Sequence, residues 1–136
     1  MKVKDCITKQ VVTIDPKVSA KQAFGTMKSL GIRHLVVVDN EAVVGIVTDR
    51  DLRRPKVADI FKSWDQVYRV SDEFEVEDVM STPVTTITAD ADVREAAKIM
   101  IERRIGALPV TDAHHQLAGI ITESDLLKAL IKLADR

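Results

Sequence analysis

The sequence predicts an α+β protein made of two β-α-β-β-α repeats packed about a pseudo-twofold axis. Three observations support this fold class. The second half of the chain repeats the first in order, with one inserted residue. In each half, short apolar runs alternate with amphipathic segments of helical spacing. Each half also contains an apolar run that turns directly into a helix through Thr-x-x-Asp. One repeat has too little core to be stable alone, so the two should pack together.

The internal repeat relates positions at a nearly constant spacing. Asp5 and Asp78 lie 73 residues apart, and the spacing becomes 74 once one extra residue enters the second copy. Other related positions are Val11 and Val84, Ala23 and Ala96, Met27 and Met100, Leu35 and Leu108, Gly45 and Gly119, and Thr48 and Thr122. We therefore predict a first repeat over residues 1–54, a connector over 55–73 and a second repeat over 74–136.

Each repeat should contain a short turn, an extended piece, a helix, a β-hairpin and a final helix. Ser19 and Asp92 precede the first helices and are expected as their N-caps. Ala23, Met27 and Leu30 recur at helical spacing and predict the buried face of the first helix. The predicted bounds are turns at 3–7 and 76–80, extended pieces at 11–14 and 84–87, helices at 19–30 and 92–103, hairpin strands at 34–38, 43–47, 107–111 and 117–121, and final helices starting at 48 and 122, the second reaching 133.

The connector differs in composition from the repeats. The stretch of residues 53–75, which includes it, holds four of the five aromatic residues of the chain, Phe61, Trp64, Tyr68 and Phe74. Their spacing, together with Val57, predicts a helix over residues 56–68. Such a helix either packs on its own domain or forms a surface for a partner or a second copy, because aromatic residues are enriched at interfaces.

Composition excludes several classes of protein. The net charge of -1 and the lack of a basic block argue against nucleic-acid binding. Cys6 is the only cysteine, so no internal disulfide can form, which favours a reducing, cytoplasmic setting. The first residues lack the apolar stretch of a signal peptide, and no apolar run approaches the roughly 20 residues of a membrane helix.

The two Thr-x-x-Asp turns are the strongest functional signal. They join Thr48 to Asp51 and Thr122 to Asp125, with Ser124 inside the second turn as a further candidate. The same pattern is a helix capping box, which is the structural alternative. A helix N-terminus at a strand end is nevertheless a ready phosphate site, and an Asp one turn later can accept hydrogen bonds from a ribose diol. The turns therefore indicate a nucleotide site that uses hydroxyl and carboxylate together.

Other residues could complete such sites. Backbone groups of two small pairs, Val12-Thr13 and Thr85-Thr86, are placed where they could read the edge of a base. Cationic side chains are candidate phosphate partners, although each alone is more often a solvated surface charge. These candidates are Arg33, His34, Arg50 and Arg53 in the first repeat, and Arg103 and Arg104 in the second.

The chain resembles a tandem pair of CBS (cystathionine-beta-synthase) domains, a Bateman module, of the stand-alone bacterial type. The resembling stretches are residues 31–39, 45–52, 76–80, 105–112 and 119–126. The resemblance implies that the Thr and Asp of each turn hold the phosphate and ribose of AMP, ADP, ATP or S-adenosylmethionine. It also implies that Arg33 and His34 face phosphates, whereas the second repeat departs from the pattern with Gly106-Ala107. Ala107 is retained as a candidate ligand residue.

We therefore expect a regulatory module that binds an adenosine ligand in the cleft between the copies and signals to a protein partner. The resemblance also implies a homodimer, and no cofactor is expected to be required. The competing interpretation is a structural or dimerisation module with empty sites. An enzyme is the weakest class, because the glycines are isolated and His114-His115 sit in a predicted turn.

Overall fold

The computed structural model describes residues 1–53 and 74–135, with only the backbone of Arg53. The predicted connector helix and Phe61, Trp64 and Tyr68 lie outside the described residues. The chain forms two compact units, one of Val12–Val84 and one that joins Met1–Val11 to Thr85–Arg136. The N-terminal segment thus belongs to the compact unit of the second repeat. The repeat limits at residues 54 and 74, and the pseudo-twofold packing, stay predictions.

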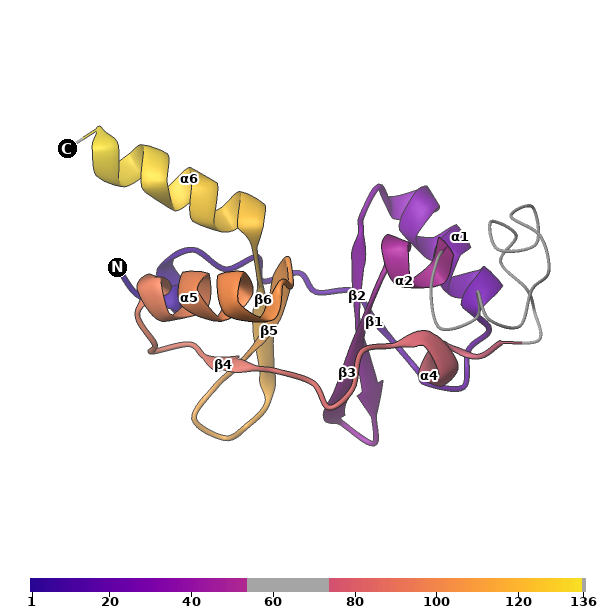
Figure 1. Ribbon diagram of the computed structural model, residues 1–136. Coiled ribbons are helices and arrows are strands. Elements are labelled where there is room, and N and C mark those ends of the chain that lie inside the picture. The colour runs from indigo at the N-terminus through magenta and orange to yellow at the C-terminus, as the bar shows by residue number, and fades with distance from the viewer. Residues whose placement is uncertain (54–73, 136) are drawn as a thin grey trace. The chain divides into compact units, whose positions relative to one another are not determined.

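The unit of Val12–Val84 contains a three-stranded sheet in the order β1-β2-β3 (Figure 1). Strand β1 pairs in parallel with β2, and β2 pairs antiparallel with β3 as the expected hairpin. The elements are β1 (Thr13–Ile14), α1 (Ala20–Leu30), β2 (His34–Asp39), β3 (Ala42–Thr48), α2 (Asp49–Arg53) and α4 (Val76–Val79). The order β-α-β-β-α of the first repeat is therefore confirmed.

Helix α1 begins and ends where its sequence dictates. The Ser19 hydroxyl accepts a hydrogen bond from the Gln22 N–H at 3.1 Å, which confirms Ser19 as the N-cap. Gly31 ends the helix at φ 65°, a left-handed conformation that glycine adopts without steric cost. Ala23 and Met27 are buried as predicted, but the Leu30 side chain is 55% exposed. The buried stripe therefore ends one turn before the helix does.

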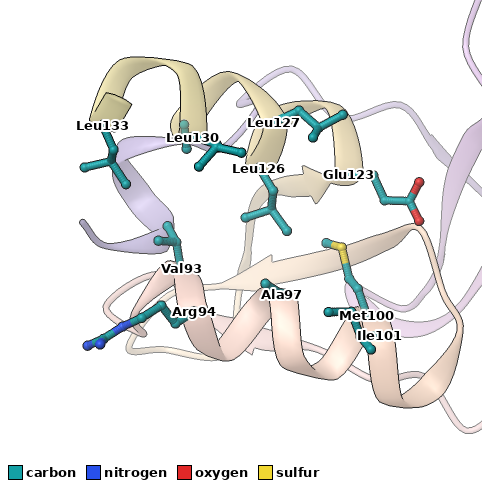
Figure 2. Close-up of a pocket in the computed structure, with 11 residues that line it drawn as sticks. Val93, Arg94, Ala97, Met100, Ile101, Glu123, Leu126, Leu127, Leu130 and Leu133 are labelled. Atoms are coloured by element: carbon teal, nitrogen blue, oxygen red, sulfur yellow. The ribbon is translucent and has the colours of Figure 1, made fainter. Parts of the chain in front are cut away.

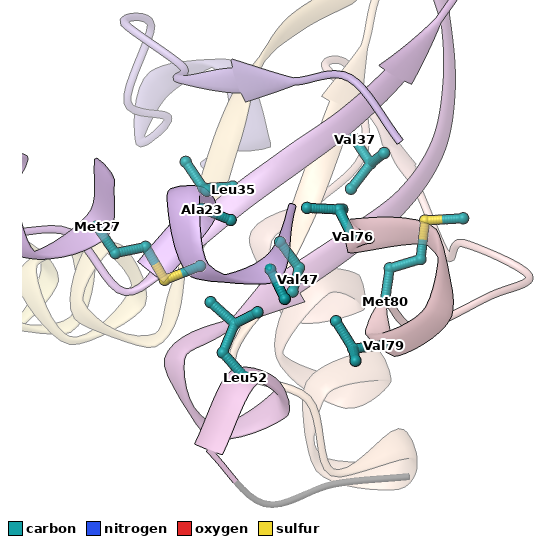
Figure 3. Close-up of a cluster of buried hydrophobic side chains, with 10 residues drawn as sticks. Ala23, Met27, Leu35, Val37, Val47, Leu52, Val76, Val79 and Met80 are labelled. Atoms are coloured by element: carbon teal, nitrogen blue, oxygen red, sulfur yellow. The ribbon is translucent and has the colours of Figure 1, made fainter. Parts of the chain in front are cut away.

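The core of this unit lies between the helices and the sheet. Figure 3 shows Ala23 and Met27 of α1 packed with Leu35, Val37 and Val47 of the sheet. Leu52 of α2 and Val76, Val79 and Met80 of the α4 segment complete the cluster. Gly45 in β3 permits this packing, because a Cβ there would lie 2.5 Å from the Met80 sulfur.

The second unit repeats this architecture with the sheet order β4-β5-β6. Its elements are a 3₁₀ turn (Val3–Asp5), β4 (Ile87–Thr88), α5 (Val93–Arg103), β5 (Ala107–Thr111), β6 (Leu117–Thr122) and α6 (Glu123–Ala134). Asp92 caps α5 by accepting from the Arg94 N–H at 2.8 Å, as predicted. The β-α-β-β-α order is confirmed here too, although β4 begins at Ile87 rather than at residue 84.

The N-terminal segment packs on this second unit. The Val3 N–H donates to the Ala91 carbonyl at 2.8 Å, and Thr8 forms an antiparallel bridge with Ile120 of β6. Gly119 permits this approach, because a Cβ there would lie 2.8 Å from the Thr8 carbonyl oxygen. Among the helices of the described residues, none is long and apolar enough to cross a membrane.

Candidate functional site

In the unit of Val12–Val84, the predicted site residues converge at one edge of the sheet. His34 lies directly opposite Thr48 in the β2-β3 hairpin. The Arg33 carbonyl accepts from the Asp49 N–H at 3.1 Å, and the Val12 carbonyl accepts from the Val36 N–H at 3.2 Å. The start of β2, the residue before β1 and the strand-to-helix turn are thus joined by backbone hydrogen bonds. Thr13 extends the same edge as the first residue of β1.

The turn from β3 to α2 is a complete capping box. The Asp51 N–H donates to the Thr48 hydroxyl at 3.1 Å, and the Thr48 N–H donates back to the Asp51 carboxylate at 3.0 Å. Thr48 and Asp51 therefore do cap α2, which is the structural alternative to a ligand role for this motif. A carboxylate offers about four acceptor positions, so a capping role is compatible with binding a ligand hydroxyl.

The turn from β6 to α6 has the same reciprocal bonds. The Thr122 N–H donates to Asp125 Oδ2 at 2.9 Å, and the Asp125 N–H donates to the Thr122 hydroxyl at 3.3 Å. The Glu123 N–H donates to the Gly106 carbonyl at 3.0 Å, which places the end of β6 beside the start of β5. Thr122 and Asp125 are half-buried, whereas Ser124 is exposed.

The second carboxylate has one additional partner that the sequence did not indicate. The Thr8 hydroxyl donates to Asp125 Oδ1 at 3.3 Å and lies 3.5 Å from Oδ2. Thr8 comes from the N-terminal segment that bridges to Ile120. Ser81, another hydroxyl residue, occupies the equivalent position 73 residues later. The recurrence of a hydroxyl at this position of the repeat is the one sequence feature that marks Thr8.

The remaining candidates of the second unit are less clearly assembled. Ala107 lies opposite Thr122 in the β5-β6 hairpin with a buried side chain. Arg103 donates from Nη1 to the Thr85 hydroxyl at 3.1 Å, and Thr86 is exposed. Arg104 is exposed and ends α5 in the left-handed region, at φ 55°. In the first unit, Arg33 and Arg50 are exposed.

A cavity of about 620 Å³ lies beside Asp125, between the N-terminal segment and α6. Its lining residues are Met1, Asp5, Cys6, Ile7, Asp125, Lys128, Ala129, Ile131 and Lys132. Burial raises the pKa of the Cys6 thiol, with Asp5 as the next cause, so the thiol stays protonated at neutral pH. Cys6 is therefore a weak nucleophile at neutral pH. Within residues 1–53 and 74–135, no His, Cys, Asp and Glu cluster could hold a metal ion.

A second cavity, of about 500 Å³, is an apolar groove between α5 and α6. Figure 2 shows Val93, Ala97 and Met100 of α5 on one wall and Leu126 and Leu130 of α6 on the other. Several large apolar side chains on these helices are exposed, namely Ile101, Leu127, Leu130, Ile131 and Leu133. Soluble proteins usually cover an apolar surface of this kind.

Two β-α-β-β-α units, each with a hydroxyl-carboxylate turn at a strand end, define a tandem-repeat α+β protein. The CBS domain family matches this chain twice, over residues 3–57 and 76–132. The chain belongs to the CBS domain family and carries two tandem copies of the domain.

Sequence relatives share this region over different fractions of their length. A protein of Methanopyrus kandleri, MK0525, is 35% identical over 121 residues, which cover 88% of this chain and 58% of that protein. Two further archaeal relatives, each 34% identical, are matched over only 23% and 46% of their length. The chain thus spans a part of these larger proteins.

Solved structures of similar size share the whole fold. The CBS-domain containing protein ATU1752 from Agrobacterium tumefaciens is 30% identical, with 96% of this chain and 99% of that chain covered and a TM-score of 0.79. The CBS domain pair of protein MJ0100, in complex with 5'-methylthioadenosine and S-adenosyl-L-methionine, is 25% identical, with 96% and 95% covered and a TM-score of 0.77.

Proposed function

We propose that this chain is a regulatory module that binds an adenosine-containing ligand and transmits its occupancy to a protein partner. The observation that carries the proposal is the convergence of His34, Thr48 and Asp51 at one sheet edge, beside the Val12 backbone. The equivalent turn at Thr122 and Asp125 supports a second site. The similar MJ0100 pair was solved with two adenosine compounds.

The residues of the first site have distinct proposed roles. Asp51 accepts hydrogen bonds from the ribose diol, and Thr48 presents its hydroxyl to a phosphate at the helix N-terminus. Arg33, His34 and Arg50 supply positive charge for the phosphates. The backbone at Val12 and Thr13 contacts the base. The ligand is bound and released unchanged, and no cofactor is required.

In the second site, Asp125 takes the place of Asp51, and Thr122 with Ser124 takes the place of Thr48. The backbone at Thr85 and Thr86 contacts the base, with Arg104 and Ala107 at the rim.

We further propose that the module is a homodimer. Support comes from the apolar groove between α5 and α6, with Leu127 and Leu130 each 61% exposed. A second copy of this face would remove those side chains from water. This face is independent of the turns that carry the ligand proposal, so the two proposals are tested separately.

The complete capping boxes favour one alternative function, a structural or dimerisation module whose sites stay empty. Mass spectrometry of compounds released from freshly purified protein, followed by calorimetric titration, separates the two. Binding of AMP, ADP, ATP or S-adenosylmethionine, with weaker binding of GTP, supports the sensor. Absence of binding by all adenosine compounds would leave the structural module as the function.

A further inference from the structure

The two candidate sites differ in where positive charge is available. The first repeat has Arg33 and His34 at the start of β2, whereas the second has Gly106 and Ala107 at the equivalent positions. A phosphate at the second turn therefore lacks the strand-start cations of the first. The cavity beside Asp125 offers two lysine side chains, Lys128 and Lys132, as a source of positive charge.

Three charged residues of α6 line this cavity from one face of the helix. Asp125, Lys128 and Lys132 lie three and four residues apart in sequence, so they follow one another along the same side. Residues with this spacing have Cβ atoms about 5–6 Å apart. A ligand held at Asp125 is thus within one or two helical turns of both ammonium groups.

The acidic and basic side chains that line the cavity differ in whether they have partners within the protein. The Asp5 carboxylate accepts from the Lys2 N–H at 2.9 Å, and the Asp125 carboxylate accepts from Thr122 and Thr8. Lys128 and Lys132, by contrast, form no ion pair with any residue in the described ranges. Both side chains are exposed enough to turn toward a ligand. The wall opposite the lysines includes apolar groups of Met1 and Ile7.

We propose that Lys128 and Lys132 supply the positive charge for the phosphate groups of an adenosine nucleotide whose ribose lies on Asp125. The first phosphate lies at Thr122, within the lysines' reach because helical side chains lean toward the N-terminus of their helix. This inference rests on the proposed function and adds the ligand class of the second site. The second site then selects phosphorylated adenosine compounds through α6, although its strand start lacks cations. Its affinity also falls with added salt, because ammonium–phosphate attraction is screened.

Site-resolved NMR tests the proposal with adenosine, AMP and ATP as probes. The amide signals of Asp125 and Lys128 report the second site, and that of Asp51 reports the first. In the double variant Lys128→Gln, Lys132→Gln we expect the preference for AMP over adenosine at Asp125 to fall about tenfold, equivalent to about 1.4 kcal/mol. Adenosine affinity should not change, because Gln keeps helix propensity and leaves Asp125 in place. Lys98→Gln, an exposed lysine on α5, is the matched control.

Cys6 provides an independent readout in the unmodified protein. It is the only cysteine and lines the same cavity, so its alkylation rate reports occupancy. The raised pKa of its thiol requires an alkaline assay. We expect AMP and ATP to slow alkylation at least about threefold more than adenosine does, and the double lysine variant to lose this difference. A threefold change in rate is about 0.7 kcal/mol at 1.4 kcal/mol per decade.

The outcomes separate this inference from the function on which it rests. An AMP preference that survives in the double variant, or equal protection of Cys6 by adenosine and AMP, overturns the role of the lysines while the sensor function stands. Failure of every adenosine compound to shift the Asp125 and Asp51 amides overturns both.

Discussion

The Thr8 hydroxyl donates a hydrogen bond to Asp125 Oδ1 at 3.3 Å and so joins residues 117 positions apart in the sequence. The bond ties the N-terminal segment to the turn proposed to bind ribose. A ribose hydroxyl would need the same carboxylate as its acceptor. Thr8 would therefore compete with a ligand at the proposed second site.

Thr8→Val keeps the shape of the side chain and removes this competing donor. A hydrogen bond to a charged carboxylate contributes about 1.5–3 kcal/mol, so adenosine affinity at the Asp125 site should rise roughly tenfold or more. NMR titration followed at the Asp125 amide measures it. Ser81→Ala, at the equivalent position of the other repeat, is the control and should leave that site unchanged. Weaker binding by Thr8→Val would make Thr8 a ligand contact instead.

Asp51→Asn and Asp125→Asn separate ligand binding from capping. The remaining Asn oxygen still accepts the Thr48 or Thr122 N–H, so the melting temperature without ligand should change little. One acceptor becomes a donor, and hydrogen bonds to charged groups are worth about 1.5–3 kcal/mol, so affinity should fall roughly tenfold to a hundredfold. We expect the larger loss at Asp51, because Arg33, His34 and Arg50 make that site the stronger.

Calorimetric titration of both single variants and the double variant, beside melts without ligand, provides the measurement. Wild-type affinity in the double variant would show that the turns are only caps. A loss of several kilocalories per mole of folding stability would lead to the same conclusion.

Arg104→Gly should stabilise the protein. Arg104 holds φ 55° at the end of α5, where the first repeat has Gly31 at φ 65°. The left-handed region costs a residue with a Cβ about 1–2 kcal/mol, so glycine should raise the melting temperature by a few degrees. The reciprocal change Gly31→Ala should lower it, as scanning calorimetry can show. An unchanged melting temperature in Arg104→Gly would mean that its side-chain contacts offset the strain.

Acid should weaken the start of α5 within a defined pH window. The hydrogen bonds from Arg94 lower the pKa of Asp92 from 3.8 to about 2. Since the folded-state pKa is the lower one, the contribution to stability is present above pH 3.8 and is lost as pH falls toward about 2. Circular dichroism across this range should show a shallower acid response in Asp92→Asn than in the wild type. Asp39→Asn, at an exposed carboxylate in the hairpin, is the comparison. Parallel acid unfolding curves for the wild type and Asp92→Asn would show that Asp92 does not contribute to this acid response.

The double variant Leu127→Glu, Leu130→Glu should dissociate the proposed dimer. Both side chains are 61% exposed, so the fold of one chain should tolerate the change, whereas burying two carboxylates in an interface is costly. Light scattering should give the mass of one chain, 15.1 kDa, for the variant and twice that for the wild type. Lys98→Glu controls for added negative charge on α5. A dimer of micromolar affinity would be populated at roughly tens of micromolar protein. A monomeric wild type at that concentration would contradict the proposed dimer.

The sequence by itself determined the local structure of this protein. Ser19, Asp92 and Thr122 cap the predicted helices because capping depends on hydrogen bonds to residues two or three positions away. The hairpins and the Thr-x-x-Asp turns were predictable for the same reason. Leu30 was predicted incorrectly as part of the buried stripe, because the exposure of a residue at a helix end depends on tertiary packing and not on helical spacing alone.

Only the tertiary structure decided which distant residues share a site. Thr8 meets Asp125 because the N-terminal segment bridges to Ile120, a long-range pairing that no local pattern encodes. Lys128 and Lys132 read in sequence as ordinary helical surface charges. They line a cavity because residues 1–7 pack against α6, so their proposed role comes from packing and not from their spacing alone.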